Sequence, residues 1–182
     1  MSKAEILANE IKQAEVELLQ NRVDANSKLI NDLTNKLVAD YCKQLDNYVR
    51  FVKELLQDDE KPPTNQELDD IVMNLPVLLY FCGEAQENLG IKTDIAKAVK
   101  QEKYNEIYKE VKGTIADKTA KSELGAQSET ITHIIYDRAY KIVKEKMNAA
   151  YELLSSCKKV ISRRITEYEL GKVDEGRFKN TR

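Results

Sequence analysis

The sequence predicts an all-α protein in which long amphipathic helices form an elongated bundle or coiled coil, with subunits that associate into an oligomer. Apolar residues recur at intervals of three and four along most of the chain, which is the helical period. The 182 residues include only six glycines and three prolines, too few for the turns of a β or alternating α/β fold. Charged residues make up 33% and hydrophobic residues 42%, a mixture typical of long helices.

The first element is a long helix expected within residues 1–57. Its apolar positions follow helical spacing from Ile11 to Leu56. Residues 24–27 read Asp-Ala-Asn-Ser, and such polar side chains compete with the helical backbone for hydrogen bonds. We therefore expect either one kinked helix or two nearly coaxial helices in this range.

A linker is expected at residues 58–64, because Pro62 and Pro63 lack the amide hydrogen that a helix needs. Thr64 and Glu67 have the spacing of a capping box, so a helix should begin directly after the linker. We expect two shorter helices in residues 65–112, the first kinked by Pro76 and ending near Gly90.

Residues 113–170 are predicted to form the longest helix, followed by a flexible polar tail at 171–182. A helix of ~40 residues reaches about 60 Å, too long to be buried within one compact globule. It therefore needs a partner along its length, either the amino-terminal helix or a second subunit. Two apolar surfaces are candidates for such contacts: the run at residues 77–82 and the apolar side of the long helix. For the run at 77–82, an intramolecular core is the favoured interpretation. The interface candidates are Leu78, Leu79, Phe81, Ile142, Leu153 and Val160.

Catalytic chemistry is not indicated. His133 is the only histidine and lies among isoleucines, which favours a packing role. Cys42, Cys82 and Cys157 are isolated from one another in the sequence and predict neither a disulfide framework nor a zinc site. We therefore expect that the protein is not an enzyme and binds no cofactor or metal. A metal site made only of carboxylates is the one alternative that remains. The absence of a signal peptide and of a spanning segment favours the cytoplasm, that of the host cell if the chain is encoded by a phage.

The charge is divided unevenly along the chain. Residues 1–91 hold 9 basic and 17 acidic side chains, and residues 92–182 hold 20 basic and 14 acidic ones. Either the halves attract each other or the second half binds a polyanion. Helical geometry places most of the basic candidates in one sector opposite the apolar side, together with Glu145 and Glu152, so a mixed, solvated face is the favoured interpretation. The candidates for nucleic-acid binding are Arg138, Lys141, Lys144, Lys158, Lys159 and Arg163.

Two further cations, Lys146 and Arg164, fall on the apolar side of the same helix. A buried cation is costly unless it is paired or reaches solvent. They either mark the register of an oligomeric interface or show that the helix bends, and we slightly favour the bend.

Tyrosines accompany the basic residues, and aromatic residues among cations are typical of single-strand binding as well as of half-buried interfaces. They are Tyr104, Tyr108, Tyr136, Tyr140 and Tyr151.

Three segments of the second half resemble small helical bacteriophage proteins of the UvsY-type recombination mediators. They are Gly-Thr-Ile-Ala-Asp-Lys-Thr-Ala-Lys-Ser-Glu-Leu at 113–124, Ile-Tyr-Asp-Arg-Ala-Tyr-Lys at 135–141 and Val-Ile-Ser-Arg-Arg at 160–164. The resemblance covers about the last 80 residues. It implies an oligomeric, nonenzymatic protein that binds single-stranded DNA and helps to load a recombinase onto strands coated by single-strand-binding protein. This chain differs in its greater length and in its acidic first half with a proline linker.

Two hypotheses follow. In the first, the chain is a phage-type accessory protein of recombination or replication that binds single-stranded DNA through its second half. In the second, it is a protein-interaction module, such as a scaffold, an assembly factor or an inhibitor of a host or phage enzyme, without affinity for nucleic acid. Both hypotheses include a protein partner, which in the first hypothesis is a recombinase or a single-strand-binding protein. Both also include self-association of the chain, and neither involves a membrane.

Overall fold

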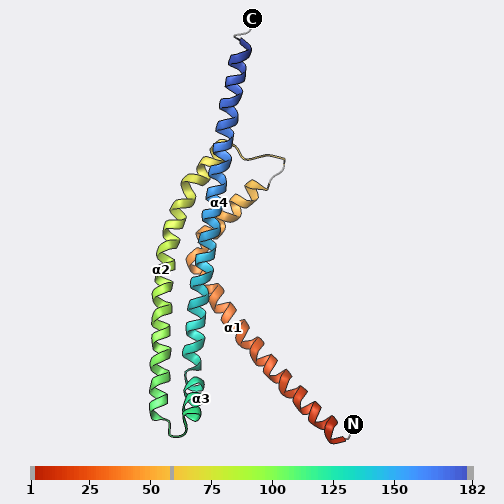
Figure 1. The fold of residues 1–182 in the computed structure, drawn as a ribbon, viewed down its shortest axis with the longest axis vertical. Coiled ribbons are helices and arrows are strands. Elements are labelled where there is room, and N and C mark those ends of the chain that lie inside the picture. Colours follow the sequence, from red (N-terminus) through yellow and green to blue (C-terminus); the bar gives the residue numbers. More distant parts are fainter. Residues whose placement is uncertain (1–2, 58–59, 180–182) are drawn as a thin grey trace. The chain divides into compact units, whose positions relative to one another are not determined.

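The computed structural model describes the backbone of residues 3–57 and 60–179 and the side chains of 15–57 and 60–172. These residues form four helices: α1 (Lys3–Leu56), α2 (Asn65–Glu110), α3 (Ile115–Gly125) and α4 (Gln127–Lys179) (Figure 1). No strand occurs in the described backbone, so the prediction of an all-α fold is confirmed.

α1 is one continuous helix of 54 residues. Residues 24–27 lie inside it, so the alternative of two separate helices is wrong. The side chains of Asp24 and Ser27 are exposed, and that of Asn26 is half-buried. Water can hydrogen-bond to exposed polar groups, so they need not compete for the backbone of the helix.

α2 begins as the sequence predicts. The backbone nitrogen of Thr64 donates to Oε2 of Glu67 at 2.7 Å, and the backbone nitrogen of Glu67 donates to Oγ1 of Thr64 at 3.2 Å. These reciprocal bonds satisfy two amides that the first turn leaves without helical partners. The capping box is therefore confirmed.

The end of this helix differs from the prediction. α2 continues through Gly90 to Glu110 as one helix of 46 residues, where two shorter helices were expected, and Pro76 lies within it. A glycine inside a helix costs only about 1 kcal/mol, which the packing of neighbouring residues offsets. Leu89 is fully buried directly before Gly90, and Ala96 is buried after it.

The predicted helix at 113–170 is divided. α3 begins with a capping box between Thr114 and Asp117, preceded by Gly113 with a φ of 142° that favours glycine. It ends at Gly125, and Ala126 adopts φ −98° and ψ 19° before α4 begins. A Cβ at Gly125 would lie 2.4 Å from Cδ1 of Ile107, so glycine permits this close approach of α3 to α2. The expected tail is helical through Lys179, and 180–182 lie outside the described residues.

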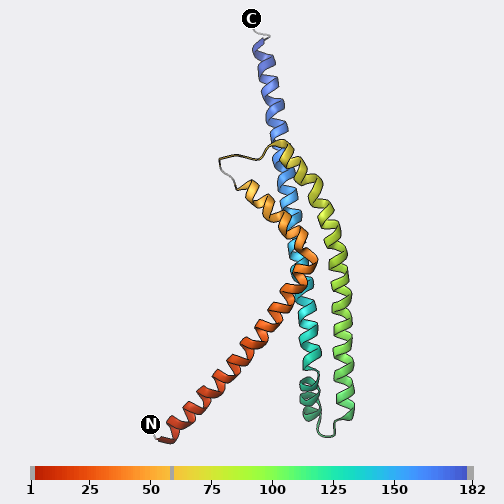
Figure 2. The ribbon, with the colours of Figure 1, turned by 180° about the vertical axis from the view of Figure 1, so that it is seen from behind.

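The chain divides into two compact units. Unit 1 is Met1–Val38 with Gly90–Ala139, and unit 2 is Ala39–Leu89 with Tyr140–Arg182. In unit 1, the second part of α2 runs beside the start of α4 (Figures 1 and 2). Outside α1, the buried side chains of unit 1 that the structure describes are few and mostly small, and Ile135 is the largest of them. They are Ala96, Ser122, Ala126, Ile135 and Ala139.

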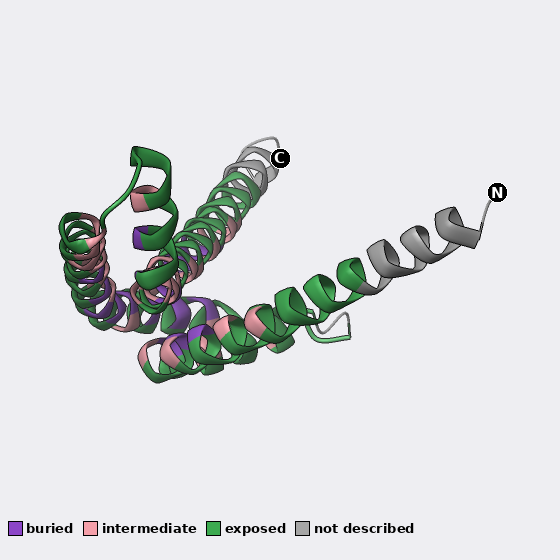
Figure 3. Ribbon diagram, turned by 90° about the horizontal axis from the view of Figure 1, so that it is seen from below, coloured by how far each residue is buried: buried purple, intermediate pink, exposed green. Residues whose placement is uncertain are grey.

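Unit 2 contains segments of α1, α2 and α4 that share a larger apolar core. The buried residues, purple in Figure 3, recur at helical spacing along each segment. α1 contributes Cys42, Leu45 and Val52. α2 contributes Leu68, Ile71, Leu75, Leu79, Cys82, Ala85 and Leu89, and α4 contributes Val143, Met147, Ala150, Leu154 and Cys157. Burial of the large aliphatic side chains stabilises this unit by about 1.5–3 kcal/mol each.

Candidate nucleic-acid interface and protein-binding surfaces

All six predicted nucleic-acid-binding cations lie on α4 and are exposed. Arg138 belongs to unit 1, and the other five belong to unit 2. Nε of Arg163 lies 3.4 Å from Oε1 of Glu167 across one helical turn, and both side chains are mostly exposed. An exposed pair of this kind contributes little energy, so it leaves the guanidinium available to a stronger anion.

The sector that the cations share is of mixed charge, as the sequence analysis favours. Glu145 and Glu152 are exposed on α4 among these cations.

A neighbouring set of positions on the same helix carries no acid. These positions follow the spacing i, i+4, i+7, i+11, i+14 and i+18, which places them on one side of a helix. We call them the α4 stripe: Lys144, Asn148, Tyr151, Ser155, Lys158 and Ser162, all of them exposed.

Tyr151 differs in exposure from the other candidate tyrosines. It is 51% exposed, two turns after Lys144 and two turns before Lys158. The other four are half-buried. Tyr104 and Tyr108 stack on each other at 6.0 Å between ring centroids, and the hydroxyl of Tyr140 accepts a hydrogen bond from Gln86 at 3.4 Å. Tyr151 is therefore the tyrosine of the five whose ring is most open to a ligand.

Lys146 and Arg164 lie on the inner side of α4, as the helical geometry predicts, and each contacts another segment of unit 2. Nζ of Lys146 lies 2.5 Å from both carboxylate oxygens of Asp46 in α1. Arg164 donates to the carbonyl of Pro63 and to Oδ1 of Asn65, both at 2.8 Å. A bend of α4 is therefore not needed to explain them, because Lys146 has an anionic partner where it lies and Arg164 is hydrogen-bonded there.

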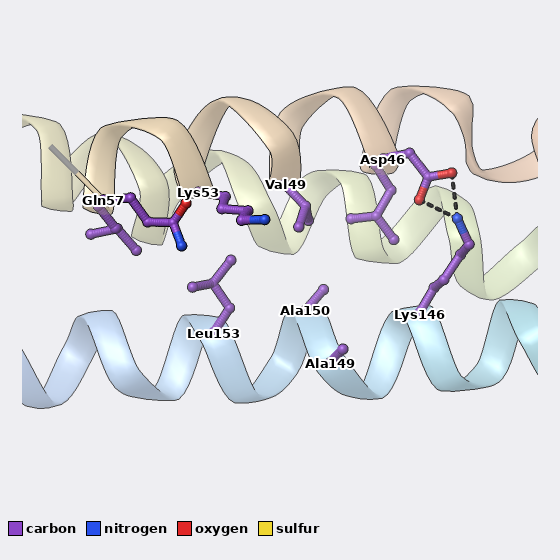
Figure 4. Close-up of a pocket in the computed structure, with 10 residues that line it drawn as sticks. Asp46, Val49, Lys53, Gln57, Lys146, Ala149, Ala150 and Leu153 are labelled. Carbon is purple, nitrogen blue, oxygen red and sulfur yellow. Dashed lines mark hydrogen bonds and ion pairs between the residues drawn. The ribbon is translucent and has the colours of Figure 1, made fainter.

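The Lys146–Asp46 pair borders a groove in unit 2 of about 430 Å³ (Figure 4). Lys53 and Gln57 of α1 and Leu153 of α4 also line it. The other lining residues are mostly apolar, so the groove has a hydrophobic surface with polar groups beside it. Leu153, one of the predicted interface residues, is half-buried here.

The predicted interface residues do not form one surface. Leu79 is 1% exposed in the core of unit 2, so its assignment to a subunit interface is wrong. The apolar run at 77–82 extends around a full turn of α2, and only one side of a turn can face the core. Leu78, Ile142 and Val160 are half-buried, whereas Phe81 is 56% exposed.

An apolar patch on α2 surrounds Phe81; three of its residues belong to the run at 77–82 that the sequence indicated, but the exposed side of that run and Met73 were not singled out. We call it the α2 patch: Met73, Val77, Tyr80 and Phe81, all exposed. The rings of Tyr80 and Phe81 meet edge to face at 5.6 Å between centroids. The spacing i, i+4, i+7 and i+8 was the available signal, but the neighbouring core positions masked it.

The three cysteines are buried and none forms a disulfide. Burial, together with the nearby Cys82, raises the pKa of the Cys42 thiol to about 12. A thiol of this kind is a poor nucleophile at neutral pH. His133 is half-buried on α4. Within residues 15–57 and 60–172, no group of three or more His, Cys, Asp or Glu side chains is arranged to hold a metal ion.

Comparison of the chain with protein-family models, with curated proteins and with solved structures finds no match. Among the described residues, none of the helices combines the length and the apolar character that a bilayer crossing requires.

Proposed function

We propose that this protein is a nonenzymatic helical accessory protein that binds single-stranded DNA through the α4 stripe and assists recombination or replication. The observation that carries the proposal is Tyr151, exposed between Lys144 and Lys158 on a side of the helix that has no acidic residue between residues 144 and 162. Exposed aromatic rings stack on bases, while lysines neutralise the phosphates between them. The resemblance of residues 113–164 to UvsY-type mediators supports the same role and adds the expectation of a phage source and of a recombinase or single-strand-binding protein as partner.

The separation of two kinds of cation on α4 supports the proposal further. The charge of Lys146 is compensated by the carboxylate of Asp46, and the guanidinium of Arg164 is hydrogen-bonded to two neutral oxygens of unit 2. Lys144 and Lys158 are exposed, about 21 Å apart at 1.5 Å per residue. A flexible single strand can follow this distance with successive phosphates, and Lys159 and Arg163 extend the contact on the adjoining sector.

The decisive experiment is fluorescence anisotropy of a labelled single-stranded oligonucleotide over a salt series. We expect Lys144→Glu with Lys158→Glu to weaken binding at least about tenfold. The reversal should also lower the slope of log K against log salt by about 1.4, because two phosphate contacts are lost. The matched control reverses Lys43 and Arg50, two exposed cations of α1 in the same unit, and changes the net charge equally.

Equal loss of affinity in the two double variants would contradict a site on the α4 stripe, because it would show dependence on net charge alone. Tyr151→Ala should also weaken binding while Tyr151→Phe retains it, since stacking needs the ring and not the hydroxyl. Tyr80→Ala removes an even more exposed ring outside the stripe and serves as the control.

The α2 patch favours a second candidate function, that of a protein-interaction module. Exposed aromatic and methionine side chains are enriched where proteins bind one another. This function predicts a complex with a protein partner that Tyr80→Ser with Phe81→Ser disrupts, and no affinity of the wild-type protein for the oligonucleotide at low salt. Tight, salt-dependent binding of the oligonucleotide would instead favour the first function.

A further inference from the structure

The first half of α1 carries a heptad pattern that the fold of a single chain leaves largely uncovered. From residue 16 to residue 37, six of the seven a and d positions of the heptad are apolar, and most of the remaining positions are polar. The a positions are Val16, Val23, Ile30 and Leu37, and the d positions are Leu19, Asn26 and Leu33. We call these seven residues the α1 seam. They lie within unit 1.

The seam is open to solvent over much of its length. Val16, Leu19 and Val23 are 51%, 59% and 61% exposed, and Leu33 is 41% exposed. The other three residues of the seam are half-buried. A row of exposed aliphatic side chains at coiled-coil spacing is costly in water unless another helix covers it.

The surface of the helix has the local shape that coiled-coil packing requires. Val16, Leu19, Gln20 and Val23 surround a hollow on one side of α1, together with Asp24. The first four have the spacing i, i+3, i+4 and i+7, which is that of the hole that receives one side chain of a facing helix.

The charges at the edges of the seam indicate what covers it. Glu15 and Lys36 are both g positions near opposite ends of the seam. If two copies pair in antiparallel orientation, each Glu15 lies opposite Lys36 of the other copy, so an ion pair forms at both ends. A parallel pair would instead place Glu15 opposite Gln20 and Lys36 opposite Tyr41, with no ion pair.

The same antiparallel register gives the one polar residue of the seam a polar neighbour. Val16 then packs on Leu33, Leu19 on Ile30 and Val23 on Asn26. The two copies of Asn26 lie in adjacent layers on either side of the two-fold axis, three residues or about 4.5 Å apart along the axis of the helices. Their amides can hydrogen-bond to each other across the axis, which a buried amide requires. A parallel pair would also bring the two amides together, so the charges at the ends are what distinguish the orientations.

We propose that residues 15–37 of α1 form a two-stranded antiparallel coiled coil with a second copy of this chain. The inference is independent of DNA binding, because the seam and the α4 stripe lie on different helices. The coiled coil makes the protein a dimer and presents two copies of every other surface, which raises the effective concentration of the second site once the first is bound.

Two neighbouring leucines provide the test of the interface. Leu19 is in the seam, whereas Leu18 is at an outer c position and is 70% exposed. We expect light scattering after size-exclusion chromatography to give the wild type a mass near twice 20.9 kDa. Leu19→Glu should reduce this mass about twofold, and Leu18→Glu should leave it unchanged. Both sites are exposed, so neither change should alter the helical circular dichroism of the folded chain.

A wild-type protein that remains a monomer across a concentration series would overturn the proposal. An oligomer that Leu19→Glu leaves intact, or that both variants weaken equally, would overturn it as well.

A charge exchange tests the antiparallel orientation. Glu15→Lys alone and Lys36→Glu alone place like charges opposite each other at both ends, so each should weaken dimerisation about tenfold. The double variant exchanges the two charges and should restore the dimer. Sedimentation equilibrium measures the three dissociation constants, and a double variant weaker than either single variant would overturn the antiparallel pairing.

Discussion

At the scale of single residues, Lys146 and Asp46 form an ion pair that joins α4 to α1 within unit 2. Their side chains are 34% and 33% exposed, so both charges are partly removed from water. Attraction between charges is stronger in such surroundings than at an open surface. Replacing either partner alone would leave the other without compensation and close to apolar residues of the groove.

We expect a double-mutant cycle with Asp46→Ala and Lys146→Ala to give a coupling energy of about 1 kcal/mol in urea unfolding. Lys103 and Glu106 form the matched control, a pair at 2.8 Å whose side chains are 41% and 55% exposed. Their coupling should be near zero, because water and salt screen an exposed pair. Equal coupling energies in the two cycles would contradict the role assigned to burial.

At the scale of the elements, α2 and α3 begin at capping boxes of the same kind. Thr64 and Glu67 form the first, and Thr114 and Asp117 form the second. The backbone N–H and the hydroxyl of Thr64 lower the pKa of the Glu67 carboxyl below its ordinary value of 4.5. The hydroxyl and the backbone N–H of Thr114 lower the pKa of Asp117 in the same way. Each acid therefore favours the folded state in its ionised form.

The lowered pKa of Glu67 predicts a pH dependence of stability. The folded state resists protonation of this carboxylate, so its contribution is present above about pH 4.5 and is lost as the pH falls below that value. Glu67→Gln keeps an acceptor oxygen but cannot titrate. We expect the variant to be less stable than the wild type at pH 7 and the difference to diminish between about pH 5 and about pH 3, as measured by urea unfolding.

A difference between the two proteins that stays constant down to about pH 3 would contradict this mechanism. Asp117→Asn provides a second test of the same effect at the start of α3, where the box has an aspartate in place of the glutamate.

At the scale of the whole molecule, the two units differ in the size of their buried side chains. Among the side chains that the structure describes, nine of the ten largest fully buried ones belong to unit 2, and the tenth is Ser122 in unit 1. In unit 1, moreover, Oγ1 of Thr34 is buried without a hydrogen-bond partner, which is unfavourable. The apolar free energy of burial is therefore concentrated in unit 2.

This distribution predicts that unit 2 resists local opening more strongly. We expect hydrogen exchange with mass spectrometry to find the slowest amides around Leu75 and Val143 in unit 2, and faster exchange in residues 90–139. The slow amides should exchange at a rate set by global unfolding, as a comparison with urea unfolding can establish. Slower exchange in α3 or the start of α4 than around Leu75 would contradict this prediction.

Local features of the sequence determined the helical class of the chain and the start of α2. The period of the apolar residues depends only on neighbours within two turns, and the bonds between Thr64 and Glu67 span three residues. The same period was sufficient to place the candidate cations on the outer side of α4. It was not sufficient to single out Tyr151, because exposure distinguishes this tyrosine from the other four and depends on what packs beside each ring.

Tertiary structure decided the features that depend on residues far apart in the chain. Lys146 meets Asp46 across 100 residues, and Arg164 meets Pro63 across 101. The glycine at position 125, beside the break between α3 and α4, leaves room for the end of the Ile107 side chain, and packing around Leu89 carries α2 through Gly90. At Gly90 a local preference of about 1 kcal/mol is set against burial that is worth more. In every case only the folded chain brings together the groups that make the contact.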